Sequence, residues 1–463
     1  MLPQIFAPFV EGSPITVMAA AAVTRLLSAE RLNALFDQSR REQYTNQLLF
    51  STAFNLMAGV VMGTRHSIHH AYQTSTEQIG VSVVAVYDKL KHIETSTSQA
   101  VVRDLAAEVV PLIDQMGGAL PPPVPGYRVR ILDGNCLAAS EHRIEELRRI
   151  AAGPLPGKSL VVLDPQRRVM LDVFPCEDGH TQERALLDQV LSTVSPGDLW
   201  IDDRNFCTFG FLAGIAQRDA YFITRQHGNL TWAPLGPRKE AGPVEGGRVY
   251  AQRVRVEGQG GRSLELSRIE VHLEHATRDG DRIVYLLTNL PASGDGAVSE
   301  AQVAHAYRGR WKIETAFQEL AQHLNSEINT LAYPKAALFG FCVALVVFNA
   351  LSLMKAALRG RHGAEKIEAE VSNYYIAAEL ETTSRGMLLA IPQGRWRVFA
   401  TMPTAEFVAV MLFLAGKVNL AHYKKHPRGP KKPQPKRFYD PKHPHVSTAR
   451  LLAQRKPRKR RST

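Results

Sequence analysis

The first quarter of the chain carries apolar positions at the spacing of α-helices. Residues 14–118 are rich in Ala, Leu, Val, Gln and Glu and poor in Gly and Pro, as in consecutive amphipathic helices. The segment "GALPPPVPG" at residues 118–126 cannot continue a helix, because proline lacks a backbone N–H and fixes its own backbone angle. We therefore expect a helical N-terminal domain over residues 1–120.

Short apolar runs follow this Pro-rich segment. "YRVRILD", "SLVVLD" and "RVMLDVF" come in close succession, whereas "DLWIDD" and "AYFITR" are each preceded by a helical pattern. Short connections favour antiparallel pairing of strands, and helical connections favour parallel pairing. The predicted fold class is therefore α/β, a mixed sheet flanked by helices.

A β-rich segment interrupts this order. Residues 227–282 contain Gly-rich turns and the strand-like runs "RVYAQRVRVE" and "SLELSRIEVHLE", after which "IVYLLTNL" resumes the sheet. Helical periodicity then covers residues 299–324 and continues toward the C-terminus. The sheet domain is thus expected in two parts, 127–226 and 283–360, separated by a β-rich insertion at 227–282 and followed by a helical region at 361–420.

One apolar stretch reaches the length of a membrane span. Residues 336–354, "AALFGFCVALVVFNALSLM", are 19 residues without a charge, close to the shortest transmembrane helices. No second such stretch exists, Asn349 interrupts it, and no aromatic belt flanks it. We expect a helix buried in a large core, and no membrane partner.

The positive charge lies almost entirely at the C-terminus. Residues 421–463 hold 15 Lys or Arg and one acidic residue, Asp440, whereas the whole chain has a net charge of +12. So much like charge, mixed with Pro, predicts a basic disordered tail. Phosphate backbones are its expected partner; a solubilising role and contact with an anionic membrane are the alternatives.

The N-terminal region contains one candidate for DNA recognition. In "TEQIGVSVVAVYDKL", at residues 76–90, a short helical stretch is followed by a turn at Gly80, an N-cap at Ser82 and a second helix with Tyr87 and Lys89. The pattern fits a helix-turn-helix motif and fits plain helix packing equally well. Both interpretations stay open, and residues 1–120 are expected to bind DNA.

Three acidic residues occupy positions suited to chemistry. Asp133 follows the apolar run "RIL" and Asp203 follows "LWID", so both are expected at the edge where strands of a sheet end. Tyr307, Arg310 and Glu314 have the i, i+3, i+7 spacing of one helix face. The plainer alternatives are turn formers at the strand ends and a surface ion pair between Arg310 and Glu314.

Three converging carboxylates would suit divalent cations. Hard cations such as Mg²⁺ prefer oxygen ligands and keep water in their open positions. Two such ions can activate a water or a 3′-hydroxyl and stabilise the leaving oxygen in phosphoryl transfer. We therefore predict that Asp133, Asp203 and Glu314 are catalytic and bind two Mg²⁺ ions, with Mn²⁺ as a substitute, and that Arg310 neutralises a phosphate.

The chain resembles DDE transposases of insertion-sequence family four. The strings "ILDGN", "LWIDDRNF", "VYLLTNLP" and "YRGRWKIE" occur in that family's order, over residues 128–348. The resemblance implies a ribonuclease-H-like catalytic domain with a β-rich insertion. It also implies that Asp133, Asp203 and Glu314 are the three acids, Asp203 being preferred to Asp202 because it precedes Arg204.

The resemblance extends to the family's Tyr-Arg-Glu-Lys signature, with one departure. Tyr307 and Arg310 match its first two members and are implied to contact DNA near the cut. The Lys expected seven residues after Glu314 is replaced by Ala321. One phosphate contact of the family therefore lacks its residue here.

Together these features predict a bacterial enzyme of cut-and-paste DNA transposition. The expected partners are double-stranded DNA, as terminal inverted repeats and as target DNA, and a second copy of the chain in a synaptic complex. Its expected location is the cytoplasm, on the nucleoid when DNA-bound. Two alternatives remain: a transposase-derived DNA-binding protein without activity, and a ribonuclease-H-like nuclease without strand transfer.

Overall fold

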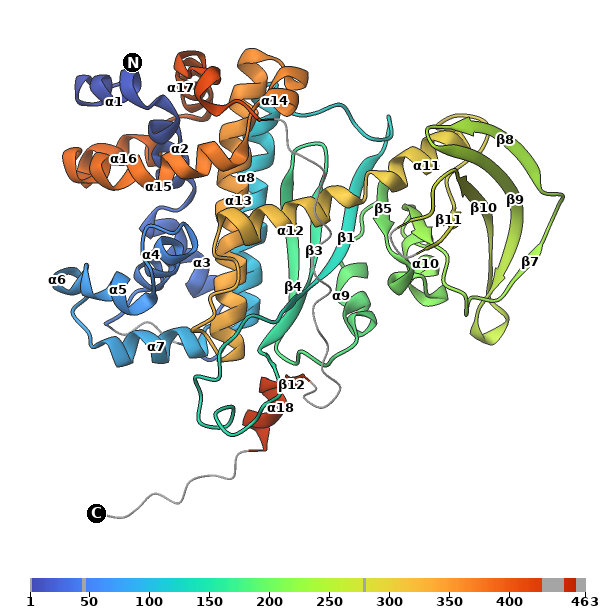
Figure 1. Cartoon of the computed structure of the whole chain (residues 1–463), viewed down its shortest axis with the longest axis horizontal. Helices are drawn as coiled ribbons and strands as arrows, with labels where there is room; N and C mark the ends of the chain where they lie inside the picture. Colours follow the sequence, from blue (N-terminus) through green and yellow to red (C-terminus); the bar gives the residue numbers. More distant parts are fainter. Residues whose placement is uncertain (1, 44–46, 278–279, 427–444, 455–463) are drawn as a thin grey trace.

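The computed structural model describes residues 2–43, 47–277, 280–426 and 445–454. Helices from both ends of the chain gather on one side of the molecule, a sheet lies in the middle, and a strongly curved β-rich part forms the opposite end (Figure 1). The candidate site residues lie where the central sheet meets the helices.

The N-terminal part is helical, as its periodicity predicts. Its helices are α1 (Ala7–Gly12), α2 (Pro14–Leu26), α3 (Ala29–Ser39), α4 (Phe50–Val61), α5 (Ile68–Gln73), α6 (Thr76–Ile79), α7 (Val83–His92) and α8 (Thr95–Gln115). Gly80 ends α6 in the left-handed conformation, and the Ser82 hydroxyl caps α7 by accepting a hydrogen bond from the Ala85 N–H at 3.3 Å. Val84 and Tyr87 are exposed on α7. The predicted turn and cap are present, and a role in DNA recognition stays a prediction.

The central sheet is mixed. Its strands are β1 (Arg128–Leu137), β3 (Gly157–Asp164), β4 (Val169–Cys176), β5 (Asp198–Asp202) and β6 (Tyr221–Arg225). They lie in the order β4-β3-β1-β5-β6. The first three strands pair antiparallel, and β1, β5 and β6 pair in parallel. This order, with these directions, is that of a ribonuclease-H-like sheet, so the predicted fold class is confirmed.

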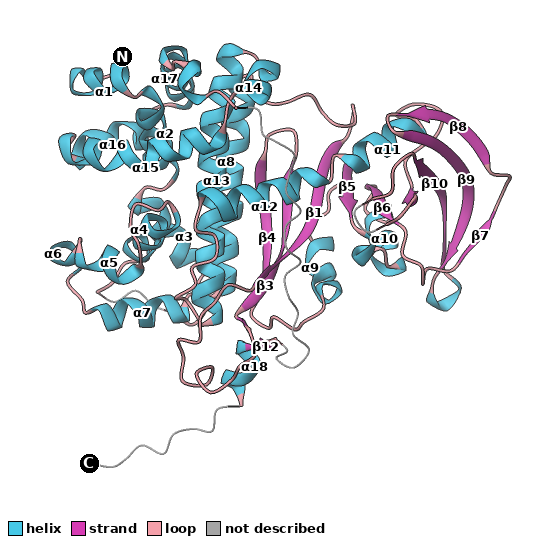
Figure 2. Cartoon of the chain, viewed as in Figure 1, coloured by secondary structure: helices cyan, strands magenta, loops and turns pink. Residues whose placement is uncertain are grey.

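The β-rich insertion continues this sheet (Figure 2). Its strands are β7 (Trp232–Pro234), β8 (Lys239–Val244), β9 (Gly247–Glu257) and β10 (Ser263–Leu273), and the chain returns through β11 (Ile283–Thr288). Because β11 pairs antiparallel with both β6 and β10, the insertion and the central strands form one ten-stranded sheet.

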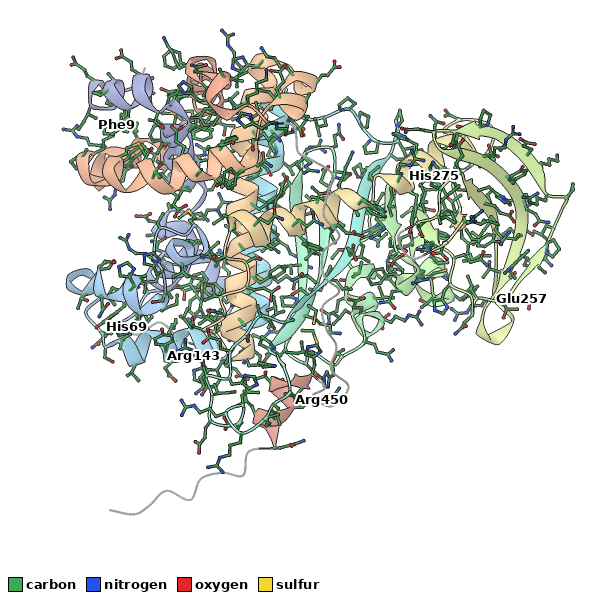
Figure 3. The ribbon with its side chains drawn as sticks, in the orientation of Figure 1. Phe9, His69, Arg143, Glu257, His275 and Arg450 are labelled. Carbon is green, nitrogen blue, oxygen red and sulfur yellow. The ribbon has the colours of Figure 1, made fainter. Side chains whose placement is uncertain are left out.

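The connection from β1 to β3 is longer than the hairpin that the sequence suggests. It spans residues 138–156 and contains β2 (Pro154–Leu155), which pairs in parallel with β12 (Val446–Ser447). The following helix, α18 (Thr448–Ala453), is held by an ion pair of 2.8 Å between Arg450 (Figure 3) and Asp178.

This docked segment corrects the prediction for the tail. A disordered tail over residues 421–463 is wrong for residues 421–425, because Tyr423 is buried and Lys424 forms a β-bridge with Val371. It is also wrong for residues 446–453, because a backbone pairing and an ion pair fix them to the sheet domain. The parts of the predicted tail at 427–444 and 455–463 lie outside the described residues.

The helix expected at residues 299–324 is divided in two. Ser299 and Gln302 form a capping box at the start of α11 (Glu300–Arg308), and α12 (Trp311–His323) follows after Gly309 and Arg310. The backbone of both linking residues remains in the right-handed helical region, so the side chains keep an approximately helical spacing. α12 packs against β1 (Figure 1).

The long apolar segment is a core helix, as predicted. In α13 (Pro334–His362), 89% of the most apolar 18-residue window is buried in the protein. Asn349 is fully buried, and its amide forms two hydrogen bonds, accepting from Met170 N at 2.7 Å and donating to Met170 O at 2.8 Å. The Asn349 side chain, which interrupts the apolar stretch, thus fastens α13 to strand β4.

Helices from the two ends of the chain share one hydrophobic core. The C-terminal helices are α14 (Ala364–Glu370), α15 (Asn373–Ala390), α16 (Gln393–Thr401) and α17 (Thr404–Lys417). They pack with α2, α4 and α8 around α13, against one face of the sheet. The Phe6 and Trp396 rings meet edge-on at 4.8 Å in this core. The N-terminal helices are therefore packed as part of a common helical layer.

The opposite face of the central sheet has a core of its own. Helices α9 (Leu187–Leu191) and α10 (Phe209–Ala216) cover it, with the buried side chains of Leu132, Trp200 and Phe222 beneath them. The central strands are thus enclosed on both faces, and polar side chains that meet water gather at the strand ends.

Candidate active site

Asp133 lies in β1, and Asp203 directly follows β5, the parallel neighbour of β1. The pairing of the two strands ends at Ile131 opposite Ile201, two residues before each acid. β1 itself continues to Leu137, paired on its other side with β3. Two residues past the end of a parallel pair, the strands no longer share hydrogen bonds, and their side chains are free to face a common ligand.

Arg310 joins the first acid to the third. Its Nη1 lies 2.8 Å from Asp133 Oδ2, and its Nη2 lies 2.7 Å from Glu314 Oε1. Arg310 is 7% exposed although it stands between two helices. Burial opposes its charge, but Asp133, and then Tyr307, Asp203 and Glu314, raise the pKa of the Arg310 guanidinium above its ordinary value. Arg310, which lies between α11 and α12, thus places a permanent positive charge among the acids.

Asp133 is held in a balance of opposing effects. Burial raises its pKa to about 6, Arg310 and the Gly134 N–H lower it, and Glu314 and Asp203 raise it again. The repulsion by two other carboxylates indicates that all three acids share one electrostatic environment. A further cation there would be stabilised by several negative charges at once.

Asp203 keeps an oxygen without a protein partner. Within the part of the chain that the structure describes, Asp203 Oδ1 is buried and accepts no hydrogen bond. Its neighbour Asp202 is fully buried and accepts a hydrogen bond from the Thr224 hydroxyl, and burial raises the Asp202 pKa to about 8. Asp202 thus holds a proton near neutrality, whereas Asp203 sits at the start of the turn after β5.

The donor set fits a divalent cation, but the three carboxylates are not gathered for one. Among the described residues, no three His, Cys, Asp or Glu side chains form a group that could hold a metal. Carboxylate oxygens are the ligands that hard cations prefer, and Asp203 Oδ1 has no hydrogen-bond partner among the residues that the structure describes. The guanidinium of Arg310 stands between Asp133 and Glu314, so that a cation bound by both would have to replace it.

Tyr307 shares the electrostatic environment of Arg310 and Asp203 and also borders a cavity. It is buried at the end of α11, and burial raises the pKa of its hydroxyl above the ordinary value, with Arg310 opposing and Asp203 adding to the shift. Its ring lines a cavity of about 380 Å³ between α11 and the insertion, next to Trp311, which is 54% exposed. The hydroxyl therefore stays protonated and can act as a hydrogen-bond donor.

The departure at Ala321 leaves an exposed position on α12. Lys312, near the start of that helix, does not replace the missing Lys. Burial lowers the Lys312 pKa, and the charges nearest to it belong to Arg168 and Glu368, on the side of the helical layer. Among the described residues of α12, no basic side chain therefore takes the place of the missing Lys beside Glu314.

Two polar residues of this region escape sequence analysis. Glu183 lies against Gly134, and Asn205 donates a hydrogen bond to the Glu183 carboxylate. The sequence around Glu183 predicts only a helix, and no spacing connects Glu183 with Asp133. Asn205 lies two residues after Asp203, and this proximity is the only feature of the sequence that could have pointed to Asn205.

The sheet domain is similar to proteins of one known family. Residues 125–347 match the family described as Transposase DDE domain, a span that contains Asp133, Asp203 and Glu314. The protein y4zB of Sinorhizobium fredii, provisionally named a transposase, is 30% identical over 133 residues, which cover 28% of this chain and only 35% of y4zB. A solved piggyBac transposase synaptic complex with hairpin DNA aligns over 85% of this chain and 81% of that chain, with 13% identity and a TM-score of 0.36. Residues 125–347 of this chain are therefore similar to the transposase DDE domain family.

Proposed function

We propose that this protein is a DNA transposase that binds the ends of an insertion sequence, cleaves them and joins them to target DNA. The observation that carries the proposal is the meeting of Asp133 and Glu314 at Arg310, with Asp203 directly after the neighbouring strand β5. All three acids lie in the span that is similar to the transposase DDE domain family. Acids on two neighbouring strands and a helix are what cation-assisted phosphoryl transfer requires.

Asp133, Asp203 and Glu314 would hold the divalent cations, Mg²⁺ with Mn²⁺ as a substitute. The chemistry that bound ions supply is activation of a water or 3′-hydroxyl and stabilisation of the leaving oxygen. The unpartnered Asp203 Oδ1 supports this assignment, since a buried carboxylate oxygen without a donor is costly unless it is ligated.

Arg310 and Tyr307 would hold the DNA at the cut. The guanidinium is buried and permanently charged, and its two terminal nitrogens, each now bonded to a different carboxylate, are donors that phosphate oxygens could accept from. In this proposal Arg310 exchanges its carboxylates for a phosphate when DNA arrives, which frees Asp133 and Glu314. Tyr307 would keep its proton and donate a hydrogen bond to the phosphate backbone of the DNA beside it.

The wider assembly follows from the same function. Terminal inverted repeats would be read by the N-terminal helices, where α7 exposes Val84 and Tyr87 after the Gly80 turn. Two copies of the chain would bring two ends together in a synaptic complex in the bacterial cytoplasm. Light scattering of the protein with end DNA measures this directly, and a mass of one chain per end in every mixture would exclude the dimer.

The deciding experiment is Mg²⁺-dependent cleavage of DNA that carries the ends of the element. Wild type is compared with Asp133→Ala, Asp203→Ala and Glu314→Ala, and with Glu319→Ala as a control on the same helix, since Glu319 faces Arg168 instead. We expect cleavage to be lost in the first three variants and kept in the control, while all four bind the DNA.

Two other outcomes would replace the proposal. Tight end binding without cleavage by the wild type, in Mg²⁺ and in Mn²⁺, would indicate a DNA-binding protein that has lost activity, with Ala321 as its first lesion. Cleavage that never leads to joining of the ends to a target would indicate a ribonuclease-H-like nuclease.

A further inference from the structure

A second cavity lies beside α12, on the side of the helical layer. It is bordered by α12, α13 and α15 and by the turn between β3 and β4, and its volume is about 50 Å³. α12 packs against both α13 and α15, and it passes close to α13 in Figure 1. A space of this size has room for a small ion or a few water molecules.

Three basic side chains line this cavity. Arg168 comes from the turn between the strands, and Lys355 and Arg359 come from α13. Arg359 is only 2% exposed. Lys355 and Arg359 have the i, i+4 spacing that brings side chains together on one helix face, where like charges repel. Positive charge is therefore concentrated in a place that water reaches poorly.

Two carboxylates offset part of this charge. Glu368 lies 3.3 Å from Lys355 Nζ and 3.1 Å from Arg359 Nη1, and Glu319 lies 3.9 Å from Arg168 Nη2. Within the part of the chain that the structure describes, these are the ion pairs of the three basic side chains. Burial lowers the pKa of the Lys355 ammonium, Glu368 opposes the shift, and Arg168 adds to it. The three cations thus act on one another across the cavity and outnumber the acids.

Arg359 has a hydrogen-bond donor left over. Its Nε donates to the Gly118 carbonyl at 2.5 Å, and its Nη1 donates to Glu368. Its Nη2 is buried and has no hydrogen-bond partner among the described residues. A buried polar group without an acceptor is costly, and more so when it belongs to a charged side chain. Independently of the excess charge, this nitrogen indicates that an acceptor is missing from the wall of the cavity.

Arg168 reaches the cavity from an unfavourable backbone conformation. Its φ is 62°, in the left-handed region that favours glycine. Its side chain is nevertheless mostly buried and forms part of the cavity wall. A bulky residue in this conformation destabilises a tight turn, and the turn here brings a guanidinium to the other two cations.

We propose that this cavity binds a tetrahedral oxyanion of the phosphate class, held by Arg168, Lys355 and Arg359. Guanidinium and ammonium groups bind such anions through charge-assisted hydrogen bonds. The site goes beyond the proposed function, because none of its residues belongs to the three-acid site. The anion connects α12, which carries Glu314, with α13 and the turn between β3 and β4. A free phosphate ion and a phosphate group of bound DNA share this chemistry.

The test begins with titration of inorganic phosphate into the full chain, without DNA or divalent cations, followed by calorimetry. Arg168→Gly is the first variant, because glycine suits the left-handed turn and should keep the fold. We expect its phosphate affinity to fall about 10-fold or more, as when a hydrogen bond from a charged group is lost. Arg361→Gln removes an exposed arginine of α13 and should bind as the wild type does. No phosphate binding by the wild type, or an equal loss in Arg361→Gln, would overturn the proposal.

Two further variants change the charge of the cavity in opposite directions. Lys355→Met should weaken phosphate binding, since it removes a cation and leaves Glu368 paired with Arg359. Glu319→Gln should strengthen it, because a carboxylate no longer competes for Arg168. Unchanged affinity in Lys355→Met, or weaker binding in Glu319→Gln, would contradict an electrostatic site. Thermal unfolding of each variant shows that it is folded.

Duplex DNA separates the two sources of the anion. If DNA supplies the phosphate group, Arg168→Gly and Lys355→Met should weaken DNA binding, and inorganic phosphate should compete with DNA less in these variants than in the wild type. If the anion is a free ion, the variants should bind DNA as the wild type does. Either result supports the site. Cleavage by the three acids is measured separately, so this proposal and the proposed function can fail independently.

Discussion

Arg310 and Asp133, 177 positions apart in the sequence, are joined by a hydrogen-bonded ion pair of 2.8 Å. The same guanidinium bonds Glu314 at 2.7 Å, so two acids of the candidate site are held together by a cation of the protein itself. One positive charge thus holds Asp133 and Glu314 together and offsets part of their negative charge, and a metal bound by both acids must compete with Arg310.

The first prediction concerns this competition. In Arg310→Ala, Mn²⁺ should bind the protein without DNA more tightly than in the wild type, because no guanidinium opposes it. Cleavage of end DNA should nevertheless fall by about 10²- to 10³-fold, the loss typical of one charged group that stabilises a transition state. Mn²⁺ titration and single-turnover cleavage measure the two effects.

The control for this prediction is Arg308→Ala. Arg308 lies two residues before Arg310, and its replacement removes only an exposed ion pair with Glu245. It should change neither quantity, since exposed pairs contribute little. Weaker Mn²⁺ binding in Arg310→Ala would mean that the guanidinium builds the cation site and does not compete with it.

The second prediction concerns pH and Asp202. Its pKa in the folded protein is about 8, above the ordinary value of 3.8, so the folded state binds a proton that the unfolded chain releases. The protonated Asp202 therefore contributes its full share of the unfolding free energy below about pH 4, and this contribution is lost as the pH rises toward 8. Asp202→Asn should therefore be more stable than the wild type above pH 8. Between about pH 4 and pH 8, its unfolding free energy should fall less than that of the wild type.

Urea unfolding at a series of pH values, in the presence of EDTA, measures this difference. Asn can accept the same hydrogen bond from Thr224, so the substitution removes the titration and little else. Parallel pH curves for the two proteins would show that Asp202 is ionised in the folded state.

The third prediction concerns the attachment of α13 to the sheet. Asn349→Ala leaves the N–H and the carbonyl of Met170 without partners in a dry core and opens a small cavity. We expect a loss of about 3 kcal/mol in unfolding free energy, from unsatisfied groups and poorer packing. Ser352→Ala, which removes a single buried oxygen from the same helix, should cost much less. Equal losses in urea unfolding would refute a special role for the Asn349 amide.

The fourth prediction concerns the basic end of the chain. Removal of residues 455–463, "RKPRKRRST", takes away six Lys or Arg and leaves the docked segment of β12 and α18 in place. General DNA affinity should fall and its dependence on salt should become shallower, by about 0.9 for each phosphate that the protein no longer neutralises. Binding of non-specific duplex at several salt concentrations measures both.

The chemistry should be unaffected by this truncation. Single-turnover cleavage of end DNA at saturating protein should match that of the full chain, because the removed residues follow a segment anchored at Asp178. A slower cleavage step at saturation would place the tail within the reaction.

Local patterns determined most of the elements. The strand runs around Asp133 and Asp203, the β-rich insertion and the core helix through Asn349 each follow from a hydrophobic period that neighbouring residues alone decide. Sequence could not foresee the division of the long helix at Gly309 and Arg310, since both residues keep helical backbone angles. Nor could it foresee that residues 446–453 dock, because their partner strand β2 lies almost 300 residues earlier.

By itself, the sequence determined the types of residue available for the chemistry: three acids, a tyrosine and an arginine at spacings typical of strand ends and one helix face. Only the tertiary structure decided their relations. It set Asp133 in β1 and Asp203 directly after the neighbouring strand β5, placed Arg310 between Asp133 and Glu314, and brought Glu183 over Gly134. These are contacts between segments far apart in the chain, and their geometry depends on how the sheet, its helices and the buried charges fit together, which no local pattern encodes.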